Sequence, residues 1–501
     1  MAGLGGDCFW LIWSSRDRKL MALNGSGRSA KAATIDFYRN KGHRDKIPSR
    51  GPLAANTVPG TVDGWFEAHQ RLGQLEWRNL FDRAILYAEQ GIPVPRSTAR
   101  WLAKDRDILA KYDLTARTFL PHGQVLQVGG VLVQKDLARS FQRIADGGRD
   151  AFYKGDIARE ITSYLQNNGG LLSMDDFSAH HSDWVEPIKT SYRDVDVYTL
   201  PPNTQGLSVL LILNMIEGID IDHMGDVSAD YKHTIVEATK IAFADRDRWV
   251  TDPEKVQVPM DRLLAKDYAE ERRQRIDPRR ALKPNEVKPG NPGSGRPGLG
   301  SLGPSMGPRM GGDTIYLCAV DKYGNAVSLI QSIYHDFGSA VIGGNTGIIL
   351  QNRGSFFSLD PNHVNRLEPN KRTFHTLMPS MMLKNGRPYI MFGTMGGEGQ
   401  PQTQTAMITR MIDFGYNVQQ AIEAPRWLYG RAWGEQELSL KVEARFPKDT
   451  VEELRRRGHQ VEVVDDWAEV MGHAQAISIS HDNGVLAGGA DPRGDGVAIG
   501  W

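Results

Sequence analysis

The order of apolar and polar residues divides the chain into a helical front part and a strand-rich end. Over 65–268 apolar residues recur mostly at spacings of three and four, clearest over 80–88 and 235–244, and this spacing predicts amphipathic helices. Residues 195–200 instead have the composition of a strand, which a polar turn closes before a helix that ends near Glu217. The front part is therefore predicted to be a helical layer plus strands.

Two hairpins are predicted in the second part of the chain. Residues 314–320 and 326–330 are rich in β-formers and flank a polar turn, and residues 380–394 turn at Asn385-Gly386, a strong hairpin signal. Both faces of these strands are apolar, which is typical of sheets that are covered on each side. A helix over about 402–414 is predicted to follow the second hairpin.

The two parts are separated by a segment rich in glycine and proline. Residues 284–312 hold six Pro and nine Gly in 29 residues, with almost no side chain to bury. Such a segment cannot offset its ordering entropy, so it is predicted to be mobile, and an interdomain linker is its ordinary interpretation.

The overall composition excludes several classes of protein. Of the 501 residues, 40% are hydrophobic and 24% are charged, which is ordinary for a globular protein. The 60 basic residues equal the 60 acidic ones, so a nucleic-acid partner is not expected. The two cysteines, Cys8 and Cys318, cannot form a disulfide framework and are predicted to be buried.

The apolar segments and the start of the chain indicate where in the cell the protein is expected. No stretch approaches the roughly 18 apolar residues of a membrane span, so no membrane partner is predicted. No basic segment precedes an apolar run at the start, so a cytoplasmic protein is expected. The chain enters an apolar strand at Phe9–Trp13 almost at once, and we expect that earlier elements of this domain lie upstream.

No cofactor or metal is predicted. The chain contains no Walker loop and no zinc-ligand spacing, and the glycines of 393–397 lack the third glycine and the downstream acid of a dinucleotide site. The histidines His122, His180, His181 and His233 also show no ligand spacing.

The candidate catalytic residue lies at the end of the glycine-rich segment. The segment stops at Asp313, and Thr314 heads a core strand. In a self-processing N-terminal nucleophile hydrolase, such a threonine attacks the preceding carbonyl, the peptide shifts to an ester, and water cleaves it. The freed Thr314 would then carry an α-amine with a pKa near 8, which can act as general base for its own hydroxyl. Autocleavage is therefore predicted between Asp313 and Thr314.

At this point the chain resembles the γ-glutamyltranspeptidase family over essentially its whole length. The order and spacing of many short segments carry this resemblance. They are Val58-Pro59-Gly60, Ala151-Phe152-Tyr153-Lys154-Gly155, Gly169-Gly170-Leu171-Leu172, Asp175-Asp176-Phe177, Pro201-Pro202, Glu237-Ala238 with Lys240, Ala244-Asp245-Arg246, Asp252-Pro253, Thr314, Gly324–Ser328, Phe337-Gly338, Gly396-Gly397 and Asp491-Pro492-Arg493.

The resemblance implies a fold and a domain organisation. The fold would be α+β, a four-layer αββα sandwich of the N-terminal nucleophile hydrolase type, formed as one interlocked domain from two autoprocessed pieces. The pieces would be a large subunit, 1–313, which ends in the mobile linker 284–312, and a small catalytic subunit, 314–501. The two processed fragments are expected to bind each other, and whether the pair dimerises is left open. The resemblance also implies that N-terminal elements are missing.

The same resemblance assigns the acyl-transfer residues. Thr314 would be both the scissile residue and the nucleophile, and Ser332 would support it through a hydrogen bond. Gly396 and Gly397 match the glycine pair whose amides form the oxyanion hole, which suits a turn with no side chain in the way. A plain tight turn is the alternative interpretation of these glycines.

The residues expected to bind the glutamyl group depart from the family pattern. Ser26 stands where an arginine clasps the α-carboxylate, although Arg28 follows two positions later. Tyr334 replaces an asparagine, Phe356 replaces the aspartate that pairs with the α-amine, and His375-Thr376 replaces a serine pair.

These departures point to a different acyl group. An ammonium against Phe356 would lose a charge-assisted bond, whereas Arg353, Arg28 and Arg372 offer cations, with His375 nearby. An acyl group with a carboxylate but no α-amine is thus predicted, as in oxamate amidohydrolases and cephalosporin acylases. Surface positions for Arg28 and Arg353, a core role for His375 and simple packing of Phe356 are the alternatives.

The leading hypothesis is an autoprocessing amidohydrolase that cleaves a small carboxylated acyl amide, oxamate-like or glutaryl-like, through an acyl-enzyme on Thr314. One alternative is a glutathione hydrolase or γ-glutamyltransferase, and another is an uncleaved, non-catalytic family member. The leaving group and the choice between water and an acceptor amine are not determined by the sequence.

Overall fold

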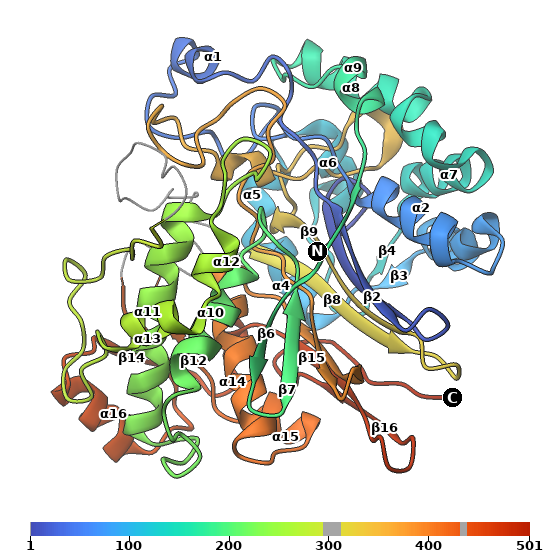
Figure 1. The fold of residues 1–501 in the computed structure, drawn as a ribbon. Coiled ribbons are helices and arrows are strands. Elements are labelled where there is room, and N and C mark those ends of the chain that lie inside the picture. Colours follow the sequence, from blue (N-terminus) through green and yellow to red (C-terminus); the bar gives the residue numbers. More distant parts are fainter. Residues whose placement is uncertain (1, 294–311, 431–437) are drawn as a thin grey trace.

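Two antiparallel β-sheets pack face to face at the centre of the molecule (Figure 1). The computed structural model describes residues 2–293, 312–430 and 438–501. The first sheet contains, in spatial order, β5 (Asp183–Val185), β2 (Lys19–Gly25), β1 (Asp7–Ser14), β9 (Ala326–His335) and β8 (Gly312–Val320). The second contains β16 (Leu486–Ala490), β15 (Ala474–Ile479), β11 (Arg387–Thr394), β10 (Ser380–Lys384), β7 (Val195–Thr199) and β6 (Ile188–Tyr192). Each sheet therefore combines a block of strands from the front part of the chain with a block from its second part.

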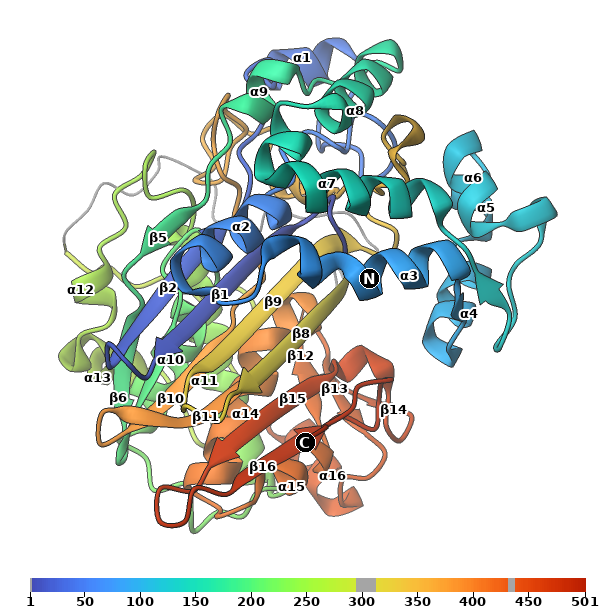
Figure 2. The same cartoon turned by 90° about the vertical axis from the view of Figure 1, so that its right-hand side faces the viewer.

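Helices cover the outer faces of both sheets (Figure 2). α2 (Thr61–Leu72) lies on β1 and β2, with α3 (Asp82–Gln90) and α7 (Lys135–Tyr153) behind it. The second sheet is covered by α10 (Leu207–Ile216), α14 (Gln400–Ile412) and α15 (Val418–Glu423), and α11 (Ala229–Trp249) packs outside α10. The α+β class expected from the sequence is thus observed.

The remaining elements are short or peripheral. They are α1 (Ile35–Asn40), β3 (Ile92–Pro93), α4 (Arg96–Lys104), α5 (Arg106–Leu109), α6 (Asp113–Phe119), β4 (Val131–Leu132), α8 (Asp156–Asn167), α9 (Met174–Ser178), α12 (Met260–Leu263), α13 (Lys266–Arg273), β12 (Trp427–Tyr429), β13 (Leu440–Glu443), α16 (Lys448–Arg456) and β14 (Val461–Val464). Within the described ranges, no helix is long and apolar enough to span a membrane.

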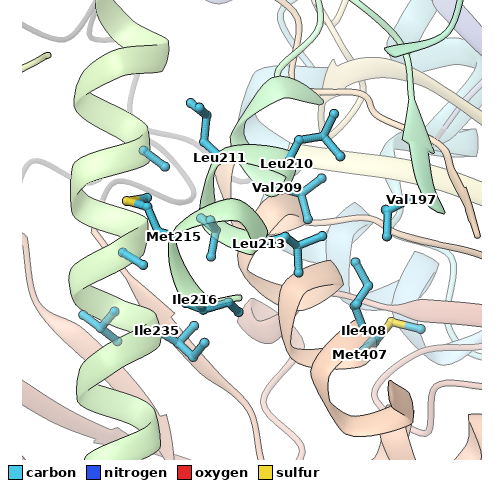
Figure 3. Close-up of a cluster of buried hydrophobic side chains, with 14 of the residues drawn as sticks. Val197, Val209, Leu210, Leu211, Leu213, Met215, Ile216, Ile235, Met407 and Ile408 are labelled. Carbon is cyan, nitrogen blue, oxygen red and sulfur yellow. The ribbon is translucent and has the colours of Figure 1, made fainter. Parts of the chain in front are cut away.

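Apolar side chains fill two main layers of the core. Between the sheets, Phe9, Tyr316, Met381 and Met391 pack together. Outside the second sheet, all ten residues of α10 are buried between α11 and α14, and its side chains meet those of both helices (Figure 3). A helix that is apolar on every side is stable only in such an enclosed position.

Most of the predicted elements are confirmed. The first hairpin is β8–β9, and the second is β10–β11, which turns between Lys384 and Arg387. The helix predicted over 402–414 is observed as α14, two residues earlier. β5 and β6 were missed in the helical front part, because β6 is short and its outward positions are polar. Cys8 is buried as predicted, whereas Cys318 is only partly buried, and both thiols are free.

The first part of the predicted linker 284–312 makes polar contacts with the rest of the chain. The Gly290 N–H donates to Asp245 Oδ1 at 2.6 Å, and Arg272 Nη2 donates to the Lys288 carbonyl at 2.8 Å. Arg272 and Asp245 form a buried ion pair at 3.0 Å, so polar contacts hold a backbone that has few apolar side chains. The backbone at Lys288 and Gly290 thus contacts the folded part of the chain, whereas residues 294–311 lie outside the described residues; the mobility of the segment stays a prediction.

Candidate active site

The predicted nucleophile, Thr314, lies on β8, the edge strand of the first sheet, at a register shift. Asp313 pairs with Tyr334, but between this pair and the next one β9 has two residues, Ser332 and Ile333, opposite the single Thr314. This β-bulge in β9 breaks the regular ladder beside Thr314, and bulges of this kind reorient side chains next to active sites. The hairpin therefore places Thr314 at its irregular end.

The hydroxyl of Thr314 is held by Ser332. Thr314 Oγ1 donates to Ser332 Oγ at 3.2 Å, and the Tyr334 N–H donates to the same oxygen at 2.8 Å. Thr314 is 9% exposed and Ser332 is 1% exposed. Ser332 thus lies where the family resemblance expected a supporting hydroxyl.

The predicted oxyanion glycines form the turn between β11 and α14. Gly396 has φ 130° and Gly397 has φ 54°, conformations that an L side chain rarely adopts. The 3-10 turn Gly397–Gly399 contacts β8, the strand of Thr314. Neither the Gly396 nor the Gly397 N–H donates a hydrogen bond to another described residue. Two free backbone donors next to β8 are what an oxyanion hole requires.

Arg353 is a buried cation with an incomplete set of partners. It is 1% exposed, and its Nη1 donates to Thr376 Oγ1 at 3.1 Å. Its Nε and Nη2 have no hydrogen-bond partner among the described residues. Burial lowers the pKa of Arg353 to about 10, so it is still charged at neutral pH. A buried guanidinium with two unused donors is a strong receptor for a carboxylate.

Aromatic rings line one side of Arg353. Its guanidinium carbon is 4.2 Å from the centroid of the Tyr334 ring, which in turn lies 4.6 Å from Phe356. Phe356 also packs against Phe374 at 5.5 Å. The position that the family gives to an amine-binding aspartate is therefore part of an apolar wall beside Arg353.

His375 has its two ring nitrogens occupied. Nε2 lies 3.2 Å from Asp7 Oδ2, and Nδ1 accepts from the Leu377 N–H at 3.2 Å. Burial holds the pKa of His375 well below its ordinary value, so the ring is neutral. These contacts support the alternative of a satisfied core histidine.

Asp7 on β1 is a functional candidate that the sequence did not reveal. Its Oδ1 accepts from the N–H groups of Gly27 and Gly60, both at 3.1 Å, and from Gln351 Nε2 at 3.0 Å. Burial raises the pKa of Asp7 to about 6, although these hydrogen bonds and Arg353 oppose the shift. An aspartate before an apolar strand was the only signal for it.

The other two arginines are already paired. Arg28 Nη2 lies 2.5 Å from Glu254 and 3.6 Å from Asp183. Arg372 also forms an ion pair with Asp183, and its Nε donates to the Ser26 carbonyl at 3.0 Å. Their charges are thus compensated by carboxylates in direct contact, whereas Arg353 interacts with the carboxylate of Asp7 without forming an ion pair with it.

A buried glutamine joins the two halves of the site and was also missed. Gln205 Nε2 donates to the Thr376 carbonyl at 2.6 Å and to the Gly397 carbonyl at 2.9 Å. Its Oε1 accepts from Arg246 Nη1 at 3.1 Å, and Arg246 Nη2 lies 3.0 Å from Glu398. The sequence marked residues 201–206 only as a turn.

Among the residues that the structure describes, two groups have metal-ligand chemistry that the sequence did not predict. One is buried and comprises His233, Glu237 and His459; the other is exposed and comprises Asp220, Asp222 and His223. In the buried group, His233 Nδ1 lies 2.8 Å from His459 Nε2, and Lys240 donates to Glu237 at 2.6 Å. An ammonium on the carboxylate opposes a second cation there, so the buried group is a hydrogen-bonded network.

The family follows from a match over the whole chain. A family model described as Gamma-glutamyltranspeptidase matches residues 1–501. The chain belongs to the γ-glutamyltranspeptidase family. It is therefore an enzyme of the N-terminal nucleophile hydrolase type, and the predicted resemblance is confirmed.

Individual relatives cover the chain fully. It is 47% identical over 500 residues to the glutathione hydrolase-like YwrD proenzyme of Bacillus subtilis (strain 168), covering 100% of this chain and 90% of that protein. It is 40% identical over 506 residues to the oxamate amidohydrolase proenzyme of Klebsiella pneumoniae subsp. pneumoniae, again covering 100% and 90%. The crystal structure of cephalosporin acylase from Bacillus halodurans matches with a TM-score of 0.90 and 37% identity over 100% of this chain and 88% of that one.

Proposed function

We propose that this family member is an autoprocessing amidohydrolase whose nucleophile is Thr314. Cleavage between Asp313 and Thr314 would yield fragments 1–313 and 314–501, which stay interlocked in one four-layer αββα domain. The proenzyme names of the relatives support this cut, as does the position of Thr314 beside the bulge in β9.

The proposed reaction has two stages. In the precursor, the Thr314 hydroxyl attacks the Asp313 carbonyl, the peptide shifts to an ester, and water releases the new amino terminus. In the mature enzyme, the α-amine takes the hydroxyl proton while Oγ1 attacks the substrate amide. The amides of Gly396 and Gly397 stabilise the oxyanion of the tetrahedral intermediate. The C–N bond then breaks, the protonated α-amine gives its proton to the departing amine, and water hydrolyses the acyl-enzyme to release the acid.

The substrate class is inferred from the buried guanidinium of Arg353, in which two nitrogen atoms have no hydrogen-bond partner among the described residues. Its free Nε and Nη2 would bind a carboxylate of the acyl group in two hydrogen bonds. Thr376 would keep the guanidinium in place through its contact with Nη1. The substrate is thus a small amide whose acyl part carries a second carboxyl group, and no cofactor enters the reaction.

Two classes of acyl group satisfy this requirement, one without an α-amine and one with it. The apolar wall of Tyr334 and Phe356 favours an acid without an α-amine, such as an oxamate-like or glutaryl-like group, because an ammonium there would lack a charged partner. The 47% identity to a glutathione hydrolase-like protein favours a γ-glutamyl group instead, and this is stronger support from the comparisons than the 40% identity to an oxamate amidohydrolase. The γ-glutamyl alternative is therefore kept as the second candidate.

A gel and a substrate panel test the proposal. Processed protein should give bands of about 35 and about 21 kDa, in proportion to the two fragments of the 55.7 kDa chain. Thr314→Ala should remain one band and be inactive, whereas Thr314→Ser should process and turn over slowly. The panel compares ammonia release from oxamate with cleavage of glutaryl-anilide and γ-glutamyl-anilide.

Two results would contradict the proposal. Efficient cleavage of the Thr314→Ala variant between Asp313 and Thr314 would exclude Thr314 as the self-processing nucleophile. A single stable band at 55.7 kDa in wild-type protein, without activity on any of the three substrates, would favour the uncleaved, non-catalytic alternative.

A further inference from the structure

We propose that Gln205 is a positioning residue that fixes the oxyanion glycines relative to the carboxylate-binding arginine. The inference rests on the proposed function of Gly396, Gly397 and Arg353, and adds a residue that touches neither substrate nor nucleophile. Gln205 follows β7 and is fully buried. It comes from the proposed large fragment, whereas the groups it holds belong to the small fragment.

The carboxamide of Gln205 bridges two loops. Its Nε2 has two hydrogens, and they go to two different backbone carbonyls, that of Thr376 at 2.6 Å and that of Gly397 at 2.9 Å. Both donors of one amide group are therefore used, and the distance between the two loops is set by a single nitrogen. No other residue type of similar length can donate twice from one uncharged planar group.

Arg246 fixes the orientation of this carboxamide. Its Nη1 donates to Gln205 Oε1 at 3.1 Å, so a flipped amide would place a donor against a guanidinium. Its Nη2 also lies 3.0 Å from Glu398 Oε1. The oxyanion loop is thus held at two consecutive residues, by Gln205 at the Gly397 carbonyl and by Arg246 at the Glu398 side chain.

The loop needs external support because it is built from glycines. Gly396 and Gly397 both have positive φ. Glycine adopts positive φ at little cost, but it also adopts other conformations at little cost, so the backbone there is intrinsically flexible. Local hydrogen bonds run from the Gly399 N–H to the Gly396 carbonyl, at 2.8 Å, and from the Gln400 N–H to the Gly397 carbonyl. Both stay within the turn, so the contact from Gln205 is what ties the Gly397 carbonyl to another loop. A misplacement of about 1 Å at such donors can cost about 10²-fold in rate.

The second arm of Gln205 reaches the carboxylate-binding half. Thr376 presents its carbonyl to Gln205 and its Oγ1 to Arg353 Nη1, at 3.1 Å. Gln205 therefore sets the separation between the place of the oxyanion and the place of the substrate carboxylate. This separation determines how long an acyl group must be to place its carbonyl oxygen at the glycine amides and its carboxylate at Arg353.

The test replaces Gln205 by methionine, which has a similar length and no hydrogen bonds. Gln404→Met is the matched control, because Gln404 is equally buried and its carboxamide hydrogen-bonds to the Met378 carbonyl, at 2.8 Å, and to Ser380 Oγ rather than to the glycine turn. Initial rates with the best substrate of the panel are divided by the processed fraction on a gel, and thermal unfolding is recorded for each variant.

We expect Gln205→Met to lower kcat by about 10²-fold with KM changed less than about threefold, because transition-state donors are displaced more than ground-state binding. Gln404→Met should lose stability to a similar degree and keep kcat within about threefold. An equal loss of kcat in both variants, or an unchanged kcat in Gln205→Met, would overturn the inference.

Two further outcomes keep the test decisive. If Gln205→Met does not fold, Gln205→Asn replaces it, since the shorter amide cannot reach both carbonyls, and an unchanged kcat would again overturn the inference. An active Thr314→Ala variant would refute the proposed function itself. An inactive Thr314→Ala together with a fully active Gln205→Met would refute only the role of Gln205.

Discussion

At the scale of single residues, the buried guanidinium of Arg353 allows the substrate hypothesis to be tested by one substitution. Arg353→Ala should lower kcat/KM by about 10²-fold or more for glutaryl-anilide and γ-glutamyl-anilide alike, because both lose a charge-assisted pair of hydrogen bonds. Processing on a gel should be unaffected. Arg28→Ala is the comparison, since Arg28 is already paired with Glu254. An equal loss in Arg28→Ala, or none in Arg353→Ala, would contradict the assignment.

The choice between the two acyl groups depends on Phe356. Phe356→Asp should raise kcat/KM for γ-glutamyl-anilide relative to glutaryl-anilide by about tenfold or more, because a carboxylate would then meet the α-amine. The change should be partial, since Tyr334 still differs from the family asparagine. The ratio of the two rates is the measurement. A wild-type enzyme that already prefers γ-glutamyl-anilide would restore the glutathione-type alternative.

Asp7 should leave a signature in the pH dependence of stability. Its pKa is raised from 3.8 to about 6 in the folded protein, so the folded state keeps a proton that the unfolded state releases. The stability from this proton is present below pH 4 and is lost as pH rises through 6, a loss of about 3 kcal/mol.

Urea unfolding of Thr314→Ala with and without Asp7→Asn measures this effect in a chain that stays uncut. The difference in unfolding free energy should shift in favour of the Asn variant between pH 4 and pH 7. A pH-independent difference would show that Asp7 ionises normally.

The sequence identified the candidate nucleophile and oxyanion glycines better than the residues that position them or bind the substrate. Thr314 and the glycine pair stand in recognisable motifs, so their places could be predicted. The position of Arg353 depends on its contact with Thr376, and the bridge formed by Gln205 depends on its contact with Gly397. In both contacts the two residues are more than 20 positions apart in the sequence. No periodicity or local motif encodes such contacts.

At the scale of elements, hydrophobic patterning predicted the hairpins and the buried helix, because their apolar residues are continuous or regularly spaced. It did not predict the bulge in β9, since an extra residue changes the pairing without changing the composition. It also missed the short strands β5 and β6, whose outward residues are polar.

A close approach between the two sheets provides a test of how they position Thr314. A Cβ added to Gly393 on β11 would lie 2.3 Å from the ring of Tyr316, two residues after Thr314 on β8. Gly393→Ala should therefore destabilise the protein by about 1–3 kcal/mol and lower kcat, because β8 must move. Thermal unfolding and initial rates measure both effects.

Adding Tyr316→Leu to Gly393→Ala checks the cause. The ring is then absent, so the double variant should be less destabilised than the sum of the two single variants. Additive losses would mean that the two residues do not meet.

At the scale of the whole molecule, the proposed cut falls near the start of β8, after Asp313, and each of the two fragments contributes strands to both sheets. The first sheet combines β1, β2 and β5 from 1–313 with β8 and β9, whereas the second combines β6 and β7 with four strands from the remainder. Cut protein should therefore elute from a sizing column, without denaturant, as one peak that contains both fragments. Separate elution of the two fragments would contradict the interlocked fold.

This sharing of strands gives the precursor and the cut protein different fates after heating. The uncut chain unfolds to one molecule, whose halves remain at high effective concentration and can meet again. The cut protein releases two chains that must find each other by diffusion, so its recovery depends on dilution and competes with aggregation. Self-cleavage would thus turn a reversible folding equilibrium into a largely one-way process, in which the lifetime of the enzyme is set by how slowly it first opens.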